Sequence, residues 1–502
     1  MSEVAEIVGG STPSTDESDN FASPGIPWIT PADLSGYRAK LISHGARDIS
    51  EKGLASSSTR LMPAGTVLFS SRAPIGYVAI AANPVTTNQG FKSFVLSTEL
   101  LPDYVYYWLI RAKDLLSQFA SGTTFLEISG KRAQQIPLPI APLNEQRRIV
   151  GAIESVLPKL DAAVAALERV RANLKRYRAS ILKAAVEGRL VPTEAELARK
   201  EGRDYEPASV LLDQILAARR RRWEESELAR LRAAGKPPKD DGWKSKYKEP
   251  AAPDTSTLPP LPEGWCWSNV GQLTWSVKDG PHYSPKYSES GVPFITGGNV
   301  RPSGVDFENA KRISKELHSN LSIRCKPEFG DILYTKGGTT GIARVNTYRH
   351  EFSVWVHVAV LKLCSPIEPF YVQHCLNSPT CYAQAQRFTH GVGNQDLGLT
   401  RMVNIVLPLP PRAEQLRIVS EVDRLASLID SLDLTTEANE KRLPHLRQTI
   451  LKCAFEGKLV DQDPNDEPAS VLLERIRAER AAASTPSRKS RERFAHETEA
   501  VK

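Results

Sequence analysis

Apolar residues recur every three or four positions along two long stretches of the chain. The first stretch carries Ile149, Ile153, Val156, Leu160, Val164, Leu167, Val170, Leu174, Tyr177 and Ile181. The second carries Ile418, Val422, Leu425, Ile429, Leu432, Leu443, Leu446 and Ile450, with Thr436 and Asn439 at the two intervening positions. This alternating 4-3 spacing is the a/d pattern of a coiled coil. We therefore predict two long helices that pair with each other in antiparallel orientation.

An amphipathic helix lying on a globular core is the alternative to this coiled coil. The charged flanks favour the coiled coil, and so does the length, about 65 Å per helix at 1.5 Å per residue. A rod of that length seldom lies flat on a small domain. Pro158 and Pro444 interrupt the two patterns at non-equivalent places, and we expect each proline to kink or break its helix.

The remaining blocks mix short β-type runs with turns. The predicted strands are residues 66–70, 77–80, 332–334 and 356–361, and the predicted short helices are residues 104–116 and 369–376. These elements indicate α+β domains of roughly 140 residues each.

The chain contains an internal duplication. Glu145-Gln146 and the Arg148-Ile-Val triplet recur as Glu414-Gln415 and an Arg417-Ile-Val triplet, an offset of 269 residues. The same offset relates Asp161 to Asp430 and residues 181–191 to residues 450–460. Residues 206–212 return as residues 467–473, so the first copy holds eight extra residues between the blocks. A gap-free match of this length indicates a repeat architecture.

The segments upstream of the helices repeat more faintly. Residues 25–30 align with residues 291–296, and residues 65–70 align with residues 330–335. Constant helices therefore alternate with variable blocks. Two like scaffolds with unlike surfaces indicate two related tasks on two different targets, and neutral divergence is the alternative.

Composition narrows the class of protein. The 502 residues are 25% charged and 41% hydrophobic, as in a soluble protein of two or more domains. No apolar run reaches eighteen residues and no signal peptide opens the chain, so we expect a cytoplasmic protein without a membrane span. The six cysteines form no CxxC pair, which favours reduced structural thiols. The net charge of +7 permits nucleic-acid binding without establishing it.

The duplicated blocks resemble the specificity (S) subunit of type I restriction-modification enzymes. The resemblance rests on the repeated segments 142–150 and 411–419, each ahead of a long helix that ends in residues 181–191 or 450–460. Residues 26–35, 70–76 and 87–92 look like target recognition domain signatures, and residues 261–265 resemble the usual opening of such a domain. The resemblance covers nearly the whole chain.

The first domain departs from this pattern, because it lacks the opener seen at residues 261–267 and starts with a segment equivalent to about Leu273. Either translation begins upstream of Met1 or the first domain lacks its entry strand. A missing edge strand would weaken DNA affinity or solubility.

The resemblance implies an α+β fold with two target recognition domains, separated by two long helices that form an antiparallel coiled-coil spacer, and with an internal pseudo-twofold repeat. The expected segments are a first recognition domain (1–140), a first helical spacer (141–195), a charged helical segment and proline-rich linker (196–262), a second recognition domain (263–409), a second helical spacer (410–482) and a polar, disordered tail (483–502).

The resemblance also implies the function. Each recognition domain would read one half of a bipartite site in double-stranded DNA, and the paired helices would set the unread gap. The helices would also dock two methyltransferase (M) subunits, through which the restriction/translocase (R) subunits join. S-adenosylmethionine, ATP and Mg would belong to these partners.

The sequence contains none of the catalytic or cofactor-binding motifs that we considered. The [Asp/Asn]-Pro-Pro-[Phe/Tyr] element of adenine methyltransferases does not occur, and neither does a phosphate-binding GxxxxGK[ST] loop. Residues 336–341 (Lys-Gly-Gly-Thr-Thr-Gly) are predicted as a tight turn between strands, and the nine histidines show no metal-ligand spacing. We expect a non-catalytic chain without a cofactor or metal site.

Base edges in the major groove are read best by Arg or Lys at guanine and by Asn or Gln at adenine. The predicted DNA contacts of the first domain are Arg38, Lys40, Arg72, Asn88, Gln89, Lys92, Thr123 and Thr124. Those of the second domain are Asn299, Arg301, Lys336, Thr339, Thr340, Asn394 and Gln395. For each residue the alternative is a turn residue or a phosphate contact without sequence information. Trp28 and Phe294, at matched positions, are predicted core residues.

The arginines at 219–222 allow two interpretations, phosphate contact or a solvated helix face. Two other functions compete with DNA reading. One is an interaction protein whose coiled coil scaffolds partners while the variable domains bind peptides. The other is a self-contained restriction or modification enzyme, which the missing methyltransferase elements disfavour.

Overall fold

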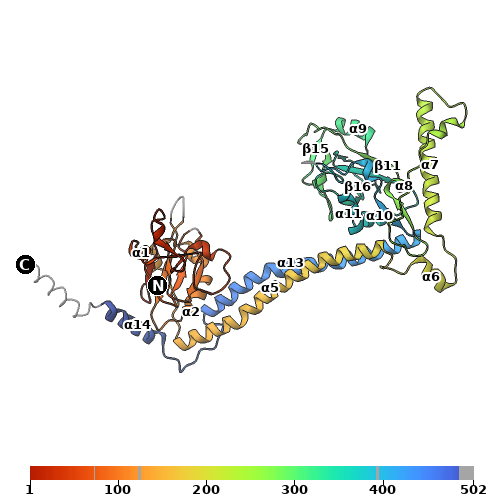
Figure 1. Ribbon diagram of the computed structural model, residues 1–502. Coiled ribbons are helices and arrows are strands. Elements are labelled where there is room, and N and C mark those ends of the chain that lie inside the picture. Colours follow the sequence, from red (N-terminus) through yellow and green to blue (C-terminus); the bar gives the residue numbers. More distant parts are fainter. Residues whose placement is uncertain (73, 122–125, 392–394, 485–502) are drawn as a thin grey trace, which may run out of the picture. The chain divides into compact units, whose positions relative to one another are not determined.

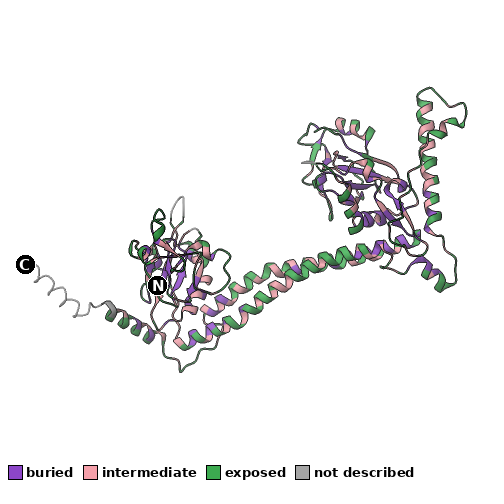
Figure 2. Cartoon of the chain, viewed as in Figure 1, coloured by how far each residue is buried: buried purple, intermediate pink, exposed green. Residues whose placement is uncertain are grey.

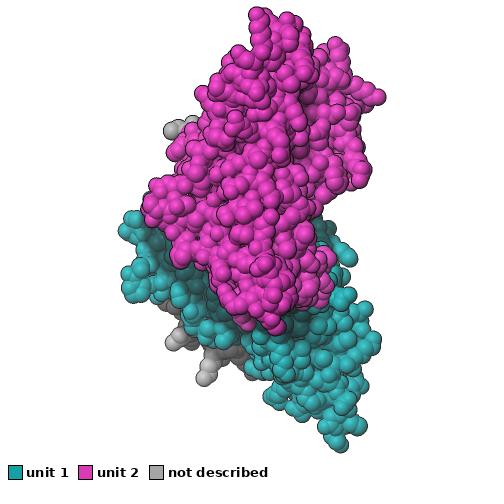
Figure 3. Space-filling view, turned by 90° about the vertical axis from the view of Figure 1, so that its right-hand side faces the viewer, with its two compact units in different colours: residues 1–168, 437–502 teal, residues 169–436 magenta. Residues whose placement is uncertain are grey.

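The computed structural model describes residues 1–72, 74–121, 126–391 and 395–484. The chain divides into two compact units, residues 1–168 with 437–502 and residues 169–436 (Figure 3). The predicted DNA contacts Thr123, Thr124 and Asn394, and residues 485–502 of the predicted tail, lie outside the described residues. No helix in the described ranges is long and apolar enough to cross a membrane.

The first unit contains the first mixed domain, which runs from β1 to α4. Its strands are β1 (Ala5–Gly9), β2 (Phe21–Ala22), β3 (Ile26–Ile29), β4 (Leu41–Ile42), β5 (Arg47–Ile49), β6 (Val67–Phe69), β7 (Val78–Ala81), β8 (Thr86–Thr87) and β9 (Lys92–Leu96). Its helices are α1 (Glu51–Ala55), α2 (Pro102–Arg111), α3 (Lys113–Ser117) and α4 (Gly130–Gln134). The strands form sheets in the orders β1-β9-β6-β7-β4 and β2-β5-β3-β8.

The second unit contains the second mixed domain, which runs from β10 to β20. Its strands are β10 (Cys266–Asn269), β11 (Thr274–Asp279), β12 (Val292–Ile295), β13 (Val300–Arg301), β14 (Gly304–Val305), β15 (Lys311–Ile313), β16 (Ile332–Thr335), β17 (Ala343–Val345), β18 (Ser353–Val354), β19 (Val358–Leu363) and β20 (Val406–Leu409). Its helices are α8 (Val270–Leu273), α9 (Lys315–Arg324), α10 (Pro369–Leu376), α11 (Pro379–Phe388) and α12 (Leu399–Met402). The main sheet has the order β11-β19-β16-β17.

The two mixed domains share one topology, which confirms the predicted α+β duplication. The order β1-β9-β6-β7 corresponds to β11-β19-β16-β17, and the parallel pair β3·β8 corresponds to β12·β18. The strands expected from sequence and the helix at 369–376 are present, with ends shifted by at most a few residues, whereas the helix expected at 104–116 is divided at Ala112 into α2 and α3. Trp28 and Phe294 are both buried, as predicted.

The opening strand distinguishes the two domains. In the second domain β10 pairs with β20, and Val270 N then donates to Ile405 O at 3.1 Å. In the first domain the Met1 amino group donates to Ile136 O at 2.8 Å, which matches Met1 with Val270 rather than with Leu273. No strand among the described residues of the first unit corresponds to β10.

Two helices of 44 residues, α5 (Leu143–Val186) and α13 (Arg412–Phe455), run side by side (Figure 1). The ion pairs Asp161–Arg447 and Arg178–Asp430 join them. The residue number increases from Asp161 to Arg178 on α5 but decreases from Arg447 to Asp430 on α13. The helices are therefore antiparallel, as predicted. The offset of 269 residues carries one ion pair onto the other, so each unit contains the same contact once.

The predicted apolar seam holds only near the helix ends. Ile149, Ile153, Ile181, Ile418, Val422 and Ile429 are buried, Leu160, Leu167, Leu174, Leu425 and Ile450 are half-buried, and Figure 2 shows mostly exposed and half-buried residues between the ends of α5. The predicted seam is wrong at five exposed positions, whereas Thr436 is buried; the exposed positions are Val164, Val170, Tyr177, Leu432 and Leu446. Val422, Ile429 and Thr436 are buried at seven-residue intervals, so in this part of α13 only one of the two predicted rows is covered.

The two prolines do not end their helices. α5 continues through Pro158 and α13 through Pro444, so the expectation of a break is wrong. Both prolines lie at exposed positions. The carbonyl that loses its helical partner can there be hydrated, which lowers the cost of proline inside a helix.

A buried glutamine anchors each long helix to its mixed domain. Gln146 Oε1 accepts from Leu101 N at 3.1 Å and its Nε2 donates to Ala141 O at 2.9 Å. Gln415 does the same with Glu368 N and Pro410 O, each at 3.0 Å. Both glutamine side chains are fully buried. The repeated Glu-Gln pair is therefore explained by helix attachment.

The residue before each glutamine is also buried. Glu414 accepts hydrogen bonds from Trp265 Nε1 at 3.1 Å and from Glu194 N at 2.9 Å. Burial raises the pKa of Glu414, although these two hydrogen bonds oppose the shift. The opener tryptophan, the start of α6 (Glu194–Glu201) and α13 are thereby joined within the second unit.

The segments after the long helices dock in the same manner. α7 (Ala208–Ala233) inserts Leu211 and Ile215 into the core of the second mixed domain, and α14 (Ala469–Ser484) inserts Leu472 and Ile476 into the core of the first. These pairs are related by the second sequence offset. The repeat thus includes the docking helix as well as the long helix.

The arginine run lies on α7 at the point where this helix leaves the second mixed domain. Arg219 Nε donates to Thr274 O at 2.9 Å, and the Arg222 guanidinium lies 3.7 Å from the ring centroid of Trp275. Arg221 is exposed. The run therefore serves partly to attach the helix.

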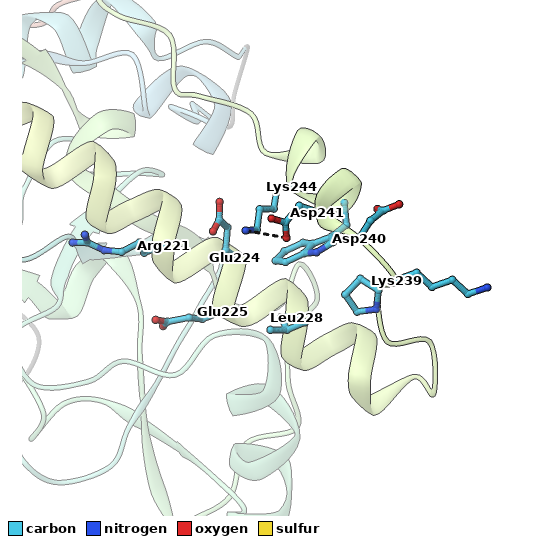
Figure 4. A pocket seen from close by; sticks show the side chains of 10 residues that line it. Arg221, Glu224, Glu225, Leu228, Lys239, Asp240, Asp241 and Lys244 are labelled. Carbon is cyan, nitrogen blue, oxygen red and sulfur yellow. Dashed lines mark ion pairs between the residues drawn. The ribbon is translucent and has the colours of Figure 1, made fainter.

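Beyond the run, α7 folds against the short helix η3 (Asp241–Lys246) through stacked Trp223 and Trp243 rings, whose centroids are 5.9 Å apart. A shallow pocket of about 670 Å³ between the two helices is lined by charged side chains of both signs, among them the Lys244–Asp241 ion pair at 3.0 Å (Figure 4).

Replacing Gln415 with alanine tests the anchoring role. Gln415→Ala leaves a buried N–H and a buried carbonyl unpaired, so we expect the free energy of unfolding to fall by about 2–4 kcal/mol. Urea titration followed by tryptophan fluorescence measures this change. Gln395→Ala, at an exposed position, is the control, and equal urea midpoints for the two variants would contradict the anchoring role.

Candidate nucleic-acid interface

A tight loop follows the same strand in each mixed domain. Gly76 N donates to Ser70 O at 3.0 Å in the first domain, and Gly341 N donates to Thr335 O at 2.9 Å in the second. Both glycines have positive φ, 98° and 102°, which other residues rarely adopt. The second loop connects the antiparallel strands β16 and β17, so the predicted turn at residues 336–341 is confirmed.

A second segment crosses each loop and is fixed to it by the backbone. Ile128 N donates to Ser71 O at 2.9 Å, and Leu397 N donates to Lys336 O at 2.8 Å. Isolated β-bridges then pair Arg72 with Glu127 and Gly337 with Asp396. The same backbone frame is therefore built twice, with different side chains on it.

In the first domain this frame brings two predicted contact residues to one carboxylate. Lys92 Nζ lies 3.3 Å from Glu127 Oε1, and Arg72 Nη1 lies 4.0 Å from Glu127 Oε2. Asn88 accepts from Gly90 N at 2.9 Å, so its side chain also shapes the adjacent turn, and Gln89 is exposed. Arg72 and Lys92 therefore form a joint site.

In the second domain the frame buries its lysine. Lys336 Nζ lies 2.7 Å from Asp396 Oδ1 and 3.5 Å from Asp279 Oδ2, and its side chain is 4% exposed. Asp279 is also paired with Arg324 Nη2 at 2.8 Å and with His282 Nε2 at 3.2 Å. Lys336, Arg324, Asp279 and Asp396 form a network of alternating charge, and the His282 ring contacts it.

A cavity of about 500 Å³ opens beside this network. It is lined by His282, Lys336, Gly338, Val356, His357, Gln395 and Asp396. The His357 ring stacks on Trp355 with centroids 4.7 Å apart. Two predicted contacts, Lys336 and Gln395, thus meet at one concave surface.

The other predicted contacts are dispersed. Arg38 is exposed, whereas Lys40 forms ion pairs with Asp103 and Glu154 at the junction with α2 and α5. Burial lowers the pKa of Lys40, but its hydrogen bonds to the two carboxylates outweigh this and raise it overall. Lys40 therefore attaches the first domain to its long helix.

In the second domain Asn299 is buried and caps a turn, because its Oδ1 accepts from Thr296 N at 2.9 Å. Arg301 pairs with Asp306 at 2.7 Å. Thr339 is exposed, and Thr340 is buried with an Oγ1 that has no hydrogen-bond partner among the described residues. None of these residues lines the cavity at Lys336.

The predicted contacts do not include the acidic residues beside the two loops, Glu127 in the first domain and Asp396 in the second. Glu127 and Asp396 are related by the same 269-residue offset that revealed the helices, so the signal was present in the sequence. The predicted contacts are cations, amides and threonines, so they include no carboxylate. Asp279, Arg324 and His282 carry no such signal, because their proximity depends on the tertiary fold.

No cluster of three or more His, Cys, Asp or Glu side chains suited to a metal ion occurs within the residues that the structure describes.

Comparison with known proteins gives a family for both mixed domains. Residues 1–171 and 263–441 match the family model of the type I restriction modification DNA specificity domain. The specificity subunit of the type I restriction enzyme MjaIX of Methanocaldococcus jannaschii is 28% identical over 381 residues, covering 75% of this chain and 74% of that relative. The EcoKI specificity subunit of Escherichia coli strain K12 is 24% identical and covers 96% of this chain and 95% of its own length.

Solved structures agree in fold. The HsdS subunit from Thermoanaerobacter tengcongensis matches with a TM-score of 0.50 at 16% identity, covering 90% of this chain and 95% of that chain. A chain from a structural study of complex assembly and conformational transition of the type I R-M system matches with a TM-score of 0.53 at 18% identity, covering 91% and 96%.

The charge network under the second loop is expected to be structural. Lys336→Met removes the buried cation between Asp279 and Asp396, so we expect the free energy of unfolding to fall by about 3–5 kcal/mol. Chemical denaturation of the full chain measures it. Lys278→Met, at an exposed position, should change stability by less than about 0.5 kcal/mol, and equal losses for both variants would contradict this role.

Proposed function

The chain belongs to the type I restriction modification DNA specificity family, and from this membership we propose that it reads a bipartite DNA site for a type I restriction-modification complex. Each mixed domain reads one half of the site in double-stranded DNA. The observation that carries the proposal is the repeated backbone frame at Ser71 and Lys336, because its two copies present unlike side chains. Two domains with the same backbone arrangement but different side chains are suited to two half-sites of different sequence.

Recognition rather than catalysis is the proposed task of this chain. Arg72 and Gln89 are partly or fully exposed on the first face and Gln395 on the second, and these are the residue types that pair with base edges. Catalysis of methylation and cleavage belongs to the M and R partner subunits, which supply S-adenosylmethionine, ATP and Mg. The proposed domain limits are 1–140 and 263–409, with helical segments at 141–195 and 410–482.

The helix pair is proposed to fix the unread gap and to dock two M subunits. Each helix is 44 residues long, and Gln146 and Gln415 attach each helix to a mixed domain at its start. A rigid attachment of this kind transmits helix length into a defined separation. The exposed middle of α5 leaves side chains available to partner subunits.

Duplex binding by the chain in complex with its methyltransferase partner tests the proposal. We expect affinity to fall steeply with salt, because contacts to phosphates release condensed counterions. Binding should also distinguish one duplex sequence from its permutations. Weak binding without salt dependence would instead favour a peptide-binding scaffold.

Arg72→Ala separates base reading from phosphate contact. If Arg72 reads a guanine, we expect a loss of about 1–3 kcal/mol at one base pair of one half-site, with the other half-site unaffected. Competition binding with singly permuted duplexes measures this loss. A uniform loss across all sequences, with a shallower salt dependence, would identify Arg72 as a phosphate contact instead.

A further inference from the structure

Two carboxylates stand at matched positions on the proposed reading faces. Glu127 and Asp396 are each bridged to the loop of their domain, and their side chains are 39% and 44% exposed. Neither carboxylate lies buried in a core, and neither is fully solvated. An acidic side chain on a surface that meets a polyanion is unfavourable unless it has a specific task or a counter-charge.

Each carboxylate has a lysine behind it, and the two lysines come from different strands. Lys92 begins β9 and is 16% exposed, whereas Lys336 follows β16 and is 4% exposed. The strand register shows that they are not equivalent. Lys92 lies opposite Gly9 in the first sheet, and the corresponding pair in the second sheet is Ala359 opposite Asp279.

The position of Lys336 is likewise not occupied by a lysine in the first domain. Its counterpart in the backbone frame is Ser71, whose carbonyl accepts from Ile128 as that of Lys336 accepts from Leu397. The carboxylate is thus the fixed element of the two faces, and the cation that supports it is the variable one.

The lysines are more buried than the carboxylates they pair with, and this difference indicates which of the two groups can contact DNA. A lysine that is nearly enclosed and paired to a carboxylate is poorly placed to contact DNA, but it neutralises that carboxylate and holds it in one orientation. The carboxylate oxygen that does not face the lysine can then accept a hydrogen bond. In the first domain this oxygen, Glu127 Oε2, also lies 4.0 Å from Arg72 Nη1, which is an ion-pair distance but too long for a hydrogen bond. In the second domain Asp279 shares Lys336, so the ammonium remains paired if Asp396 releases it.

An acceptor without donors selects among bases. Cytosine presents an exocyclic N4 amino donor in the major groove, and aspartate or glutamate is its matching acceptor. Adenine also presents an amino donor, at N6, but its N7 acceptor lies beside it. A carboxylate that accepts from adenine N6 would lie beside the N7 acceptor, and the two negatively polarised groups repel each other. The carboxylate therefore favours cytosine over adenine.

We propose that Glu127 and Asp396 are specificity-determining residues, each accepting a hydrogen bond from the N4 amino group of a cytosine in its own half-site. Lys92 and Lys336 are positioning residues that act through these carboxylates. This inference rests on the proposed function of the chain in reading DNA.

The experiment uses the full chain in complex with its methyltransferase partner. Competition binding is measured with duplexes that carry each of the four base pairs at every position of both half-sites. The variants are Glu127→Ala and Asp396→Ala. We expect each to lose about tenfold of discrimination, at one cytosine of one half-site, while the opposite half-site is read as in the wild type.

The opposite half-site in each variant is the control for assembly of the complex. The other base pairs of the same half-site are the control for folding of the substituted domain, because a misfolded domain would lose discrimination at all of them. The positioning role is tested by Lys92→Met alone and combined with Glu127→Ala. The two changes should affect the same base pair, and the double variant should lose no more discrimination there than Glu127→Ala alone. Additive losses at different base pairs would overturn the positioning role.

Three results would overturn the reading by these carboxylates. The first is a uniform change in affinity for all duplexes, which marks a general electrostatic effect. The second is unchanged discrimination in both alanine variants. The third is a preference for adenine at the affected base pair. If instead the wild-type complex shows no split site at all, the proposed function itself fails.

Discussion

The backbone contact between a loop and the segment that crosses it is the constraint on which both candidate faces depend. The Ile128–Ser71 and Leu397–Lys336 hydrogen bonds connect positions that are far apart in sequence. Because main-chain groups make these bonds, the side chains around them are free to differ. One frame can then carry Arg72 and Lys92 in the first domain and a buried Lys336 with Asp279 in the second. This separation of frame from surface accounts for two domains of one topology with unlike chemistry.

The long helices are held by two kinds of contact, exposed ion pairs between the helices and buried glutamines that bind each helix to its domain. Ion pairs such as Asp161–Arg447 are exposed and contribute less than about 1 kcal/mol each. Buried Gln146 and Gln415 satisfy backbone groups that would otherwise be left unpaired, so they contribute more to attachment. The repeated Glu-Gln pair is thus required by the junction between helix and domain, whatever the domain surface presents.

Much of the fold could be predicted from the sequence, because the duplication and the helical spacing are local patterns. The strands around residues 66–80 and 332–361 were identified from their β-branched and aromatic residues. Leu432 and Leu446 fit the spacing but are exposed, because the spacing along one helix does not show which positions the partner helix covers. Of the predicted contacts, Arg72, Lys92, Lys336 and Gln395 gather on the two faces, whereas Lys40 and Asn299 have structural partners. Residue type alone cannot distinguish an exposed cation from one that pairs with a distant carboxylate.

In the proposed function, the two domains use the same backbone frame to read two different half-sites that lie at a fixed separation. Single-molecule sequencing of methylated adenines, in cells that express this chain with its methyltransferase partner, tests it most directly. The account predicts a split motif whose two halves differ in sequence and are separated by a constant number of unread base pairs. Methylation at a continuous motif, at two identical halves or at no defined sequence would contradict it.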